Sequence, residues 1–359
     1  MSKRQKLVVI GNGMAPGRVL ETLFEHAPDA FDVTIFNAEP RVNYNRIMLS
    51  PVLSGEQAFE DIIIHDDDWY ADNNVTLHKG HKVVEIDRVK KTVTSEPGEV
   101  ASYDKLLIAT GSNPFIIPIP GHDLPGVLAY RDLDDVDAML DAAKDGGRAV
   151  VIGGGLLGLE AAAGLKMQGM EVTVLHLMPT LMERQLDPSA GYLLEKELAS
   201  RDIQIYTEAN TKEIIGTDKV EGVRLEDGTE IEASIVVMAV GIRPNAKLAE
   251  MADLEIGRGI KVDPYMRTSD PDIFSVGECI EFEGHTYGLV APLYEQAAIA
   301  GRILAGEPSD GFCHSETSTK LKVTGVDLFS AGDFADGDDR EEIVFRDAMR
   351  GVYKRLVLE

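Results

Sequence analysis

Two short glycine-rich segments carry the residues most suited to binding a phosphorylated ligand. Residues 153–158 (GGGLLG) fit the pattern G-x-G-x-x-G, and residues 11–17 (GNGMAPG) repeat it with Pro16 in the third glycine position and Gly17 one step later. In such a turn the first glycine permits a tight bend and the second lets the backbone approach a pyrophosphate. The N–H groups and positive dipole of the following helix then attract the anion. Proline is tolerated there because the first helical turn leaves its N–H groups unpaired.

Each turn is expected to lie between a buried strand and a helix, with a second strand to follow. The expected strands are 6–10, 32–36, 148–152 and 171–175, and the expected helices are 18–25 and 159–168. A single glycine-rich turn is a weak signal, but two complete strand–turn–helix–strand units in one chain predict two bound dinucleotides, one for each unit. The alternative is that one unit is an empty copy of the fold.

The residue after each second strand is a candidate contact to an adenosine ribose. Glu39 is expected to accept hydrogen bonds from the first ribose, because Asn37 cannot supply the charge. His176 stands after the other strand and neither favours a 2′-hydroxyl nor repels a 2′-phosphate strongly, so NADH and NADPH both remain open. Arg184 lies close enough in sequence to be a candidate for a 2′-phosphate.

Three further apolar strands each deliver a glycine and a polar group to the edge of a sheet. They are expected within residues 103–112, 235–245 and 268–279. Open α/β sheets bind their ligands at the carboxyl ends of the strands, so these groups are candidates for the same sites.

The five motifs together, over residues 1–310, resemble the two-dinucleotide-binding flavoproteins, the pyridine nucleotide-disulfide oxidoreductases. The resemblance implies an α/β fold with two Rossmann-like domains, one for FAD and one for NAD(P)H, the second inserted in the first. It implies a FAD-binding domain at 1–117 and 244–315, a NAD(P)H-binding domain at 118–243, and a partial C-terminal interface segment at 316–359.

The turns and the resemblance together give the expected site residues. Those for FAD are Gly11, Gly13, Met14, Ala15, Glu39, Arg46, Ser50, Val83, Ala109, Thr110, Gly111, Arg131, Gly277, Glu278, Pro292 and Leu293. Those for NADH or NADPH are Gly153, Gly155, Leu156, Leu157, Gly158, Glu160, His176, Arg184 and Gly241.

Roles for some of these residues follow from the resemblance. Glu278 is expected to bond the ribityl chain of the flavin, and Glu160 to lie beside the nicotinamide and the flavin. A helix at 292–306 would direct its positive dipole end at the pyrimidine edge of the flavin, or would only pack on the sheet. No side chain is expected to act as acid or base in hydride transfer, so Glu160 is the best candidate for tuning the reaction.

Within the family, the chain is similar to the flavin-containing part of assimilatory NAD(P)H-nitrite reductases. The segments responsible are 11–14, 44–50, 176–187 and 319–334. This similarity implies hydride transfer from NAD(P)H to FAD, with onward electrons to an iron–sulfur and sirohaem centre outside this chain. Two alternatives stay open, a free-standing ferredoxin or rubredoxin reductase or NADH oxidase, and a catalytically idle flavin-binding assembly subunit. Pro51 stands where such reductases usually carry a lysine.

Composition and charge exclude several other classes. The 359 residues include 61 Asp and Glu against 35 Lys and Arg, and the net charge of −26 argues against nucleic acid or an anionic membrane as partner. The longest apolar run, 235–242, is far shorter than the roughly 20 residues of a membrane span, so a cytoplasmic location is expected. Cys279 and Cys313 form no C-x-x-C pair, which excludes a cysteine-bound cluster within this chain. The acidic runs 66–68 and 336–339 match no calcium loop, so no metal site is expected.

The last residues, 350–359, have the pattern of a strand with no partner after it. Because an unpaired terminal edge strand is an unusual end, the chain is expected to be part of a longer protein, with a separate electron-donating subunit as the alternative. A homodimer is also left open.

Overall fold

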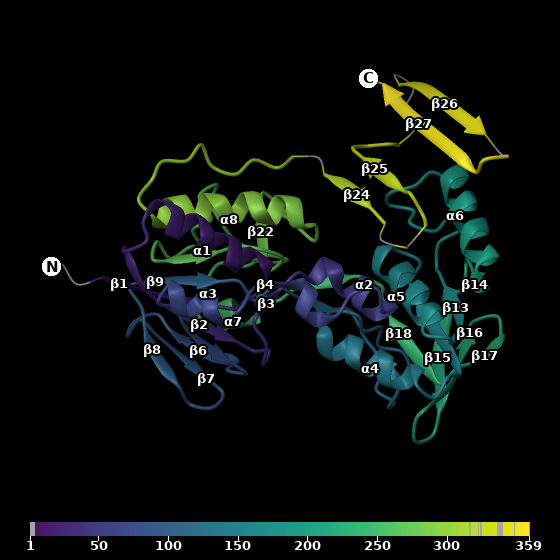
Figure 1. The fold of residues 1–359 in the computed structure, drawn as a ribbon, viewed down its shortest axis with the longest axis horizontal. Coiled ribbons are helices and arrows are strands. Elements are labelled where there is room, and N and C mark those ends of the chain that lie inside the picture. The colour runs from purple at the N-terminus through teal and green to yellow at the C-terminus, as the bar shows by residue number, and fades with distance from the viewer. Residues whose placement is uncertain are drawn as a thin grey trace. The chain divides into compact units, whose positions relative to one another are not determined.

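Each of the two expected strand–turn–helix–strand segments forms the centre of its own unit. A computed structural model describes residues 4–315, 317–321, 323, 325–335, 340–347 and 349–358. Unit 1 comprises Met1–Arg46, Phe59–Asn113 and Ile242–Ser315, and unit 2 comprises Ile47–Ala58, Pro114–Gly241 and Glu316–Glu359. Each unit therefore collects segments that are far apart in the chain, as the colours of Figure 1 show.

Unit 1 is built on a five-stranded parallel sheet. Its strands, in spatial order, are β21 (Ile273–Ser275), β9 (Lys105–Ile108), β1 (Gln5–Ile10), β2 (Phe31–Asn37) and β5 (Thr76–Lys79). The last residues of the central strands, 7–10 and 106–108, are all apolar and buried, as in parallel sheets covered on both faces. The chain passes from β1 to β2 on one side, whereas β9 lies on the other, so the carboxyl end of β1 is the point where open α/β sheets bind ligands.

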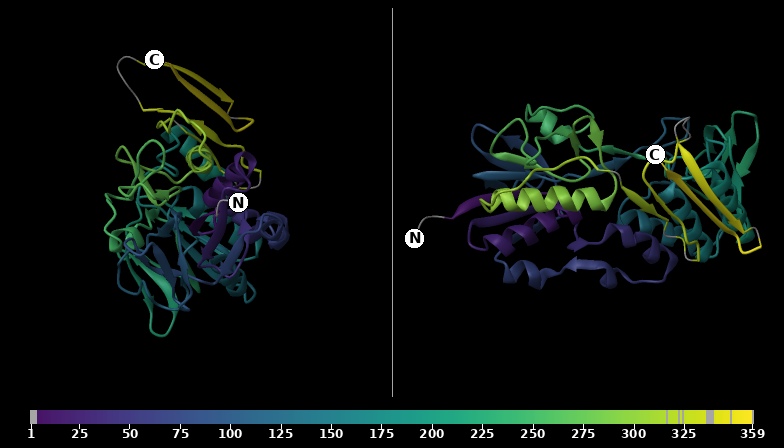
Figure 2. Two further views of the ribbon diagram at one scale, coloured as in Figure 1. Left: turned by 90° about the vertical axis from the view of Figure 1, so that its left-hand side faces the viewer. Right: turned by 90° about the horizontal axis from the view of Figure 1, so that it is seen from above.

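Two long helices of unit 1 lie side by side. α1 (Met14–His26) and α8 (Val290–Leu304) run next to each other, as Figure 1 and the right-hand view of Figure 2 show. Their close approach depends on Gly301, where an added Cβ would lie only 2.8 Å from the carbonyl oxygen of Val19. Unit 1 also contains β3 (Asn43–Tyr44), η2 (Phe59–Ile62), β4 (Ile63–His65), α3 (Asp67–Asp72), α7 (Lys247–Met251), β20 (Ile260–Lys261), β22 (Ile280–Phe282) and β23 (His285–Thr286).

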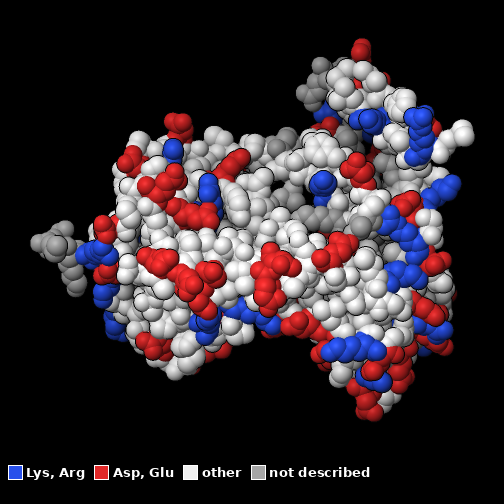
Figure 3. Space-filling view, in the orientation of Figure 1, with Lys and Arg blue, Asp and Glu red and all other residues white. Residues whose placement is uncertain are grey.

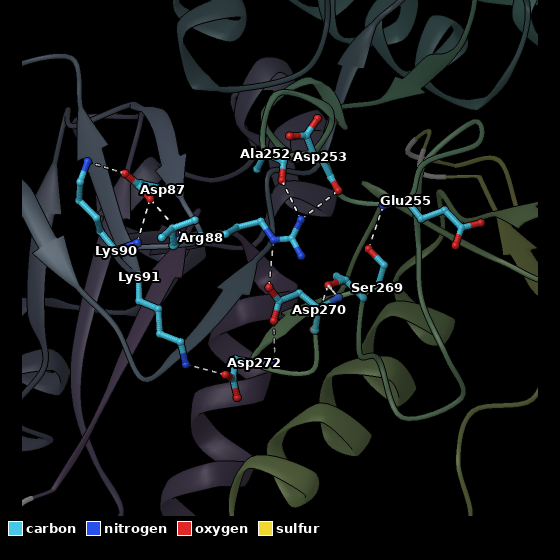
Figure 4. A network of polar contacts seen from close by, with 12 residues as sticks. Asp87, Arg88, Lys90, Lys91, Ala252, Asp253, Glu255, Ser269, Asp270 and Asp272 are labelled. Carbon is cyan, nitrogen blue, oxygen red and sulfur yellow. Dashed lines mark hydrogen bonds and ion pairs between the residues drawn. The ribbon is translucent and has the colours of Figure 1, made fainter.

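A polar network fixes a small antiparallel sheet within unit 1. The sheet consists of β6 (Val83–Asp87), β7 (Thr92–Ser95) and β8 (Val100–Ser102). Arg88, after β6, donates from Nε to Asp270 (2.9 Å) and from Nη1 to the carbonyl oxygens of Ala252 (3.2 Å) and Asp253 (3.0 Å) (Figure 4). One guanidinium thereby connects the β6–β7 turn to two distant parts of the same unit.

Unit 2 repeats the parallel sheet. Its strands, in spatial order, are β11 (Val127–Leu128), β18 (Ile235–Met238), β12 (Arg148–Ile152), β13 (Glu171–Leu175) and β14 (Ile203–Tyr206). Its helices are α2 (Leu49–Ser54), α4 (Leu133–Ala143), α5 (Leu156–Met167) and α6 (Pro188–Ser200), and an antiparallel sheet holds β15 (Thr211–Gly216), β16 (Val220–Leu225) and β17 (Glu230–Glu232). The bounds of β12 and β13 are those expected from the sequence.

Some elements differ from the expectations in extent. Within 103–112 and 235–245 the structure has two strands each, β9 then β10 (Ser112–Pro114) and β18 then β19 (Ile242–Pro244). The breaks occur at Gly111 and Gly241, whose φ angles are +67° and +116° and therefore turn the chain. The expected strand within 268–279 is confined to β21.

Residues 47–58, expected within the first part of the FAD-binding domain, lie in unit 2. The reason is packing between α2 and α5. Leu53 on α2 is fully buried, and an added Cβ at Gly164 would lie 2.7 Å from its Cγ. Gln168 Nε2 also donates to the carbonyl oxygen of Leu53 at 2.8 Å.

The C-terminal part of unit 2 consists of two hairpins, β24 (Ser318–Lys320) with β25 (Phe329–Ala331) and β26 (Glu341–Asp347) with β27 (Val352–Leu358). The expectation of an unpaired terminal strand is wrong, because β27 pairs antiparallel with the strand before it. Tyr353 and Arg355 of β27 both contact the carboxylate of Asp187, which also accepts the N–H of Ala190 (2.8 Å) and thereby caps α6.

Acidic side chains are spread over the drawn face of each unit, with Lys and Arg side chains among them (Figure 3). This distribution accords with the net charge of −26. None of the helices in the described ranges has the length and apolar character needed to cross a bilayer.

Candidate dinucleotide-binding sites

The first glycine of the turn in unit 1 is held where no other residue fits. Gly11 has φ +104°, and an added Cβ would lie 2.2 Å from the carbonyl oxygen of Ala109. Its N–H donates to the carbonyl oxygen of Phe36 (2.8 Å), and the N–H of Ala109 donates to that of Ile10 (2.8 Å). The turn is thus fixed to the ends of β1, β2 and β9.

The turn in unit 2 repeats this arrangement contact by contact. Gly153 has φ +120°, and an added Cβ would lie 2.3 Å from the carbonyl oxygen of Ala239. Its N–H donates to the carbonyl oxygen of Leu175 (2.8 Å), and the N–H of Ala239 donates to the carbonyl oxygen of Ile152 (2.9 Å). The two units therefore present the same backbone geometry at the carboxyl ends of their central strands.

The second glycines begin the two helices in nearly identical conformations. Gly13 precedes α1 with φ −81° and ψ −169°, and Gly155 precedes α5 with φ −87° and ψ −174°. An added Cβ at either position would meet no described atom within 4 Å. Neither helix has a side-chain cap or an acidic residue in its first turn, so the N–H groups of both helices are suited to an anion such as a pyrophosphate.

The place of the third motif residue in its helix explains why the first motif can carry a proline there. Pro16 is the third residue of α1, within the turn whose N–H groups have no intrahelical partner. Gly158 is the third residue of α5, and an added Cβ there would lie 1.8 Å from the carbonyl oxygen of Gly153. Met14 and Ala15 open α1, and Leu156 and Leu157 open α5.

A buried network that the sequence did not reveal supports the turn in unit 1. Asn43 Nδ2 donates to the carbonyl oxygens of Asn12 (3.0 Å) and Gly13 (2.6 Å), and the Tyr70 hydroxyl donates to Asn12 Oδ1 (3.0 Å). Burial raises the pKa of Tyr70 to about 12, so the hydroxyl stays a donor. Asn12 Nδ2 is buried and has no hydrogen-bond partner among the described residues. An unsatisfied donor in the turn and open space at Gly13 fit a bound pyrophosphate.

Glu39, the candidate ribose acceptor in unit 1, is held by two neighbours. Its Oε2 accepts from the Tyr44 hydroxyl (2.7 Å), and its Oε1 pairs with Arg46. The guanidinium of Arg46 also lies over the Tyr44 ring, 5.1 Å from its centre. A carboxylate accepts up to about four hydrogen bonds, so Glu39 retains acceptor capacity for a ribose.

The remaining candidate residues of unit 1 meet at the same sheet edge. Thr110 Oγ1 donates to the carbonyl oxygen of Asn245 (2.6 Å). The N–H of Asn245 in turn donates to the carbonyl oxygen of Gly111 (2.9 Å). Ser112 Oγ donates to Glu278 Oε2 at 2.8 Å. Ser112 and Asn245 end two of the segments that the sequence analysis singled out, but neither was named as a site residue, because their partners lie over 130 residues away along the chain.

Gly277 links that edge to both long helices. An added Cβ on Gly277 would lie 3.3 Å from the Cβ of Ala15 on α1, and its N–H donates to Gln296 Oε1 on α8 (3.1 Å). Pro292 and Leu293 lie buried in the first turn of α8. The structure thus brings together the candidates that follow β1, β9 and β21.

Three further expected FAD residues lie on other elements. Val83 begins β6 in the antiparallel sheet of unit 1. Ser50 and Arg131 belong to unit 2, where the N–H of Arg131 donates to Asp135 Oδ2 (2.6 Å) at the start of α4.

In unit 2, two hydroxyl groups linked by a hydrogen bond lead to the carboxylate of Glu160. Ser50 Oγ on α2 donates to Glu160 Oε2, and the Tyr130 hydroxyl donates to Ser50 Oγ (3.0 Å). All three side chains are buried, and burial raises the pKa of Tyr130, which keeps it a donor. Tyr130 was not predicted, since it lies 80 residues from its partner in sequence.

His176 is buried and makes contacts from both ring nitrogens. Its Nδ1 accepts the N–H of Gly154 (3.1 Å), and its Nε2 lies 2.9 Å from the carbonyl oxygen of Thr180. The side chain of Arg184, by contrast, is 86% exposed. Gly241 follows β18 and accepts the N–H of Phe115 at 2.9 Å.

The two cysteines are both free, Cys279 buried and Cys313 exposed. Burial raises the pKa of the Cys279 thiol. Within the described ranges, no group of three or more His, Cys, Asp or Glu side chains is arranged to hold a metal ion. Of the acidic runs, Asp66 caps α3 by accepting the N–H of Trp69 (2.9 Å), and 336–339 lie outside the described residues.

Comparison with known proteins places this geometry in a family. Residues 5–302 match the family described as pyridine nucleotide-disulphide oxidoreductase. The chain belongs to this family. It is an NAD(P)H-dependent flavoprotein oxidoreductase that uses FAD and a nicotinamide nucleotide. Residues 318–359, the range of both C-terminal hairpins, match the family described as rubredoxin NAD+ reductase C-terminal domain.

Two curated relatives in Bacillus subtilis (strain 168) match nearly the whole chain. The NAD(P)H nitrite reductase is 51% identical over 358 residues, and the assimilatory nitrate reductase electron transfer subunit is 42% identical over 355. The two matches cover 100% and 99% of this chain. The chain in turn spans less than half the length of each relative, 44% of the first and 46% of the second. Among solved structures, NADH:rubredoxin oxidoreductase from Clostridium acetobutylicum is 29% identical with a TM-score of 0.80, covering 96% of this oxidoreductase and 86% of that chain.

Proposed function

We propose that this oxidoreductase is the part of an assimilatory nitrite reductase at which electrons enter. NADH or NADPH binds in unit 2, and the electrons leave for an iron–sulfur and sirohaem centre outside this chain. The observation that carries the proposal is the 51% identity to a nitrite reductase over 358 residues. The 42% identity to an electron transfer subunit of nitrate assimilation supports the same role.

In this proposal each unit serves one nucleotide. The FAD-binding domain corresponds to 1–117 and 244–315 and the NAD(P)H-binding domain to 118–243, with 316–359 as interface segment. Bound FAD supplies a ring that accepts a hydride and releases electrons singly. In unit 1 the N–H groups at the start of α1 hold its pyrophosphate, Glu39 accepts from its adenosine ribose and Glu278 from its ribityl chain.

The residues of unit 2 orient the nicotinamide nucleotide. The N–H groups after Gly155 hold its pyrophosphate, which the twin geometry of the two turns supports. Glu160 tunes the reaction from a fixed position, because Ser50 holds its carboxylate. Arg46, Ser50 and Arg131 are proposed as further contacts to FAD.

A second candidate, a free-standing rubredoxin-type reductase or NADH oxidase, is favoured by the C-terminal match. Residues 318–359 match the C-terminal domain of rubredoxin NAD+ reductase. The NADH-rubredoxin oxidoreductase of Clostridium acetobutylicum is 30% identical, and the chain covers 87% of it. The two candidates share the entry of electrons and differ in the acceptor.

The test is an absorbance spectrum of the FAD-loaded chain followed by anaerobic titration with NADH and NADPH. Loss of the oxidised flavin bands with one equivalent of either nucleotide is expected. A bound flavin that neither nucleotide reduces would contradict the proposal and favour an idle assembly subunit. Reduced protein is then mixed with oxidised rubredoxin, or with the separately prepared remainder of a nitrite reductase, and rapid oxidation by rubredoxin alone would favour the second candidate.

The setting of the reaction is part of the same proposal. We place the protein in the cytoplasm, with no nucleic acid or membrane partner, in keeping with its net charge of −26. A homodimer is the oligomeric state to test by light scattering.

A further inference from the structure

The carboxyl end of β13 is where a nucleotide-binding unit of this kind meets the adenosine ribose. An acidic residue usually stands there, but the chain has His176. Its ring cannot take over that task. Nδ1 accepts the N–H of Gly154 (3.1 Å), so the proton is on Nε2, which lies 2.9 Å from the carbonyl oxygen of Thr180. Both ring nitrogens are therefore engaged within the protein.

The same ring brings a carboxylate to the end of the strand. Nε2 of His176 lies 3.2 Å from Oε2 of Glu183, whose side chain is 33% exposed. Glu183 is thus connected through one imidazole to Gly154, inside the glycine-rich turn. An acidic group is present at the strand end, although it comes from a position seven residues later in the chain.

The segment that carries Glu183 is fixed to the turn. The N–H of Met182 donates to the carbonyl oxygen of Gly154 (3.0 Å), and an added Cβ on Gly154 would lie 2.5 Å from Leu181 Cδ2. Met182 is buried with φ +52°, a conformation that a long side chain adopts only when its surroundings impose it. The backbone direction at Glu183 is therefore set by packing.

The two charges in this segment have different environments. Glu183 contacts the buried ring, whereas the side chain of Arg184 is 86% exposed and its Nε lies 4.0 Å from Glu183. A carboxylate accepts hydrogen bonds from a ribose 2′-hydroxyl and repels a 2′-phosphate. We infer that Glu183, positioned by His176, contacts the adenosine ribose and makes NADH the preferred nucleotide. This inference rests on the proposed function, in which the 153–158 turn binds NAD(P)H.

The test measures the binding of ADP-ribose and 2′-phospho-ADP-ribose to the FAD-loaded full chain by calorimetry. These ligands contain the adenosine half alone, so the result does not depend on hydride transfer. The native chain is expected to bind ADP-ribose at least about tenfold more tightly. In Glu183→Gln the ratio of the two dissociation constants falls by about tenfold. Glu183→Arg makes the 2′-phosphorylated ligand the tighter one, because the charge at the ribose changes sign.

Glu226→Gln is the matched control, since it removes one exposed carboxylate from the turn between β16 and β17 of the same unit and should leave the ratio unchanged. Unchanged melting temperatures show that each variant is folded. If the native chain prefers the 2′-phosphorylated ligand and Arg184→Ala removes that preference, the inference is wrong. If ADP-ribose binds but both Glu183 variants keep the native ratio, the inference alone fails. If neither ligand binds the native chain, the proposed nucleotide site fails with it.

Discussion

Ser50 donates a hydrogen bond to the carboxylate of Glu160, although the two residues are 110 positions apart in the chain. Ser50 in turn accepts from the Tyr130 hydroxyl at 3.0 Å. Both contacts are buried in unit 2 and connect α2 and the segment before α4 to α5. The carboxylate proposed to tune the reaction is therefore held by Ser50, the residue just before Pro51.

Removing that donor should destabilise unit 2. Ser50→Ala is expected to lower the free energy of unfolding by ~1–3 kcal/mol, because a buried carboxylate loses a hydrogen bond. Urea denaturation followed by circular dichroism measures the change. Ser54→Ala is the control on the same helix, where the hydroxyl donates to the carbonyl oxygen of Pro51 (3.1 Å) and is only partly buried. If the free energy of unfolding falls equally in both variants, the hydrogen bond to Glu160 contributes no more than the partly buried bond of Ser54.

The two glycines of the first turn should respond differently to the same substitution. Gly11→Ala is expected to destabilise unit 1 by ~2 kcal/mol or more, since φ is +104° and the methyl group would meet Ala109. Gly13→Ala meets no described atom and should cost no more than ~1 kcal/mol. It should nevertheless weaken FAD binding at least about tenfold, because the methyl group occupies the space proposed for the pyrophosphate. Thermal unfolding and flavin fluorescence titration give the two quantities, and normal FAD affinity in Gly13→Ala would remove Gly13 from the site.

His65 should make unit 1 less stable at mildly acidic pH. Burial is the largest effect and lowers the pKa of His65, against the opposing effect of Glu21, whose Oε1 lies 2.8 Å from its Nε2. The unfolded chain therefore binds the proton more readily, so the contribution of the neutral ring is present above about pH 6.5 and is lost as pH falls through the lower folded pKa.

In that window the free energy of unfolding should rise with pH by at most about 1.4 kcal/mol per pH unit for this one group. His65→Gln should flatten the slope, and His26→Gln, which removes an exposed imidazole from unit 1, is the control. A slope that is the same in the native chain and in His65→Gln would contradict the assignment.

The two thiols should react at very different rates. Cys313 is exposed, whereas Cys279 is fully buried and its pKa is raised by burial, so it lacks both access and thiolate. A disulfide reagent at pH 8 should modify one thiol rapidly in the folded chain and both in denaturant. Cys313→Ser should abolish the rapid phase, and a rapid phase that persists in this variant would show that Cys279 is accessible.

The sequence predicted the elements whose signal is local. The glycine turns and the strands β12 and β13 could be read from a few adjacent residues, because their backbone requirements are set there. The hairpin of β26 and β27 was also readable, since 341–347 mix apolar and charged residues before a turn that ends at Gly351. That partner strand was nevertheless missed.

Side-chain partners across long separations were beyond the sequence. Nothing near Ser50 indicates Tyr130 or Glu160, and nothing near Glu278 indicates Ser112, because such pairs depend on how the sheets and helices pack. His176 shows the limit most clearly. Its position was predicted as a ligand contact, but the consequence of its ring lies in the groups it holds, Gly154 and Glu183.

The near-identical dihedral angles at Gly13 and Gly155 have a consequence for how nucleotide preference can change over evolutionary time. The conformation of this second glycine therefore carries no information about which nucleotide a unit holds. Selection between FAD, NADH and NADPH must then act on side chains beyond the turns, such as those around Glu39 and Glu183. Exchanging the residues at those few positions should therefore change the coenzyme preference, while the backbone at Gly13 and Gly155 stays as it is.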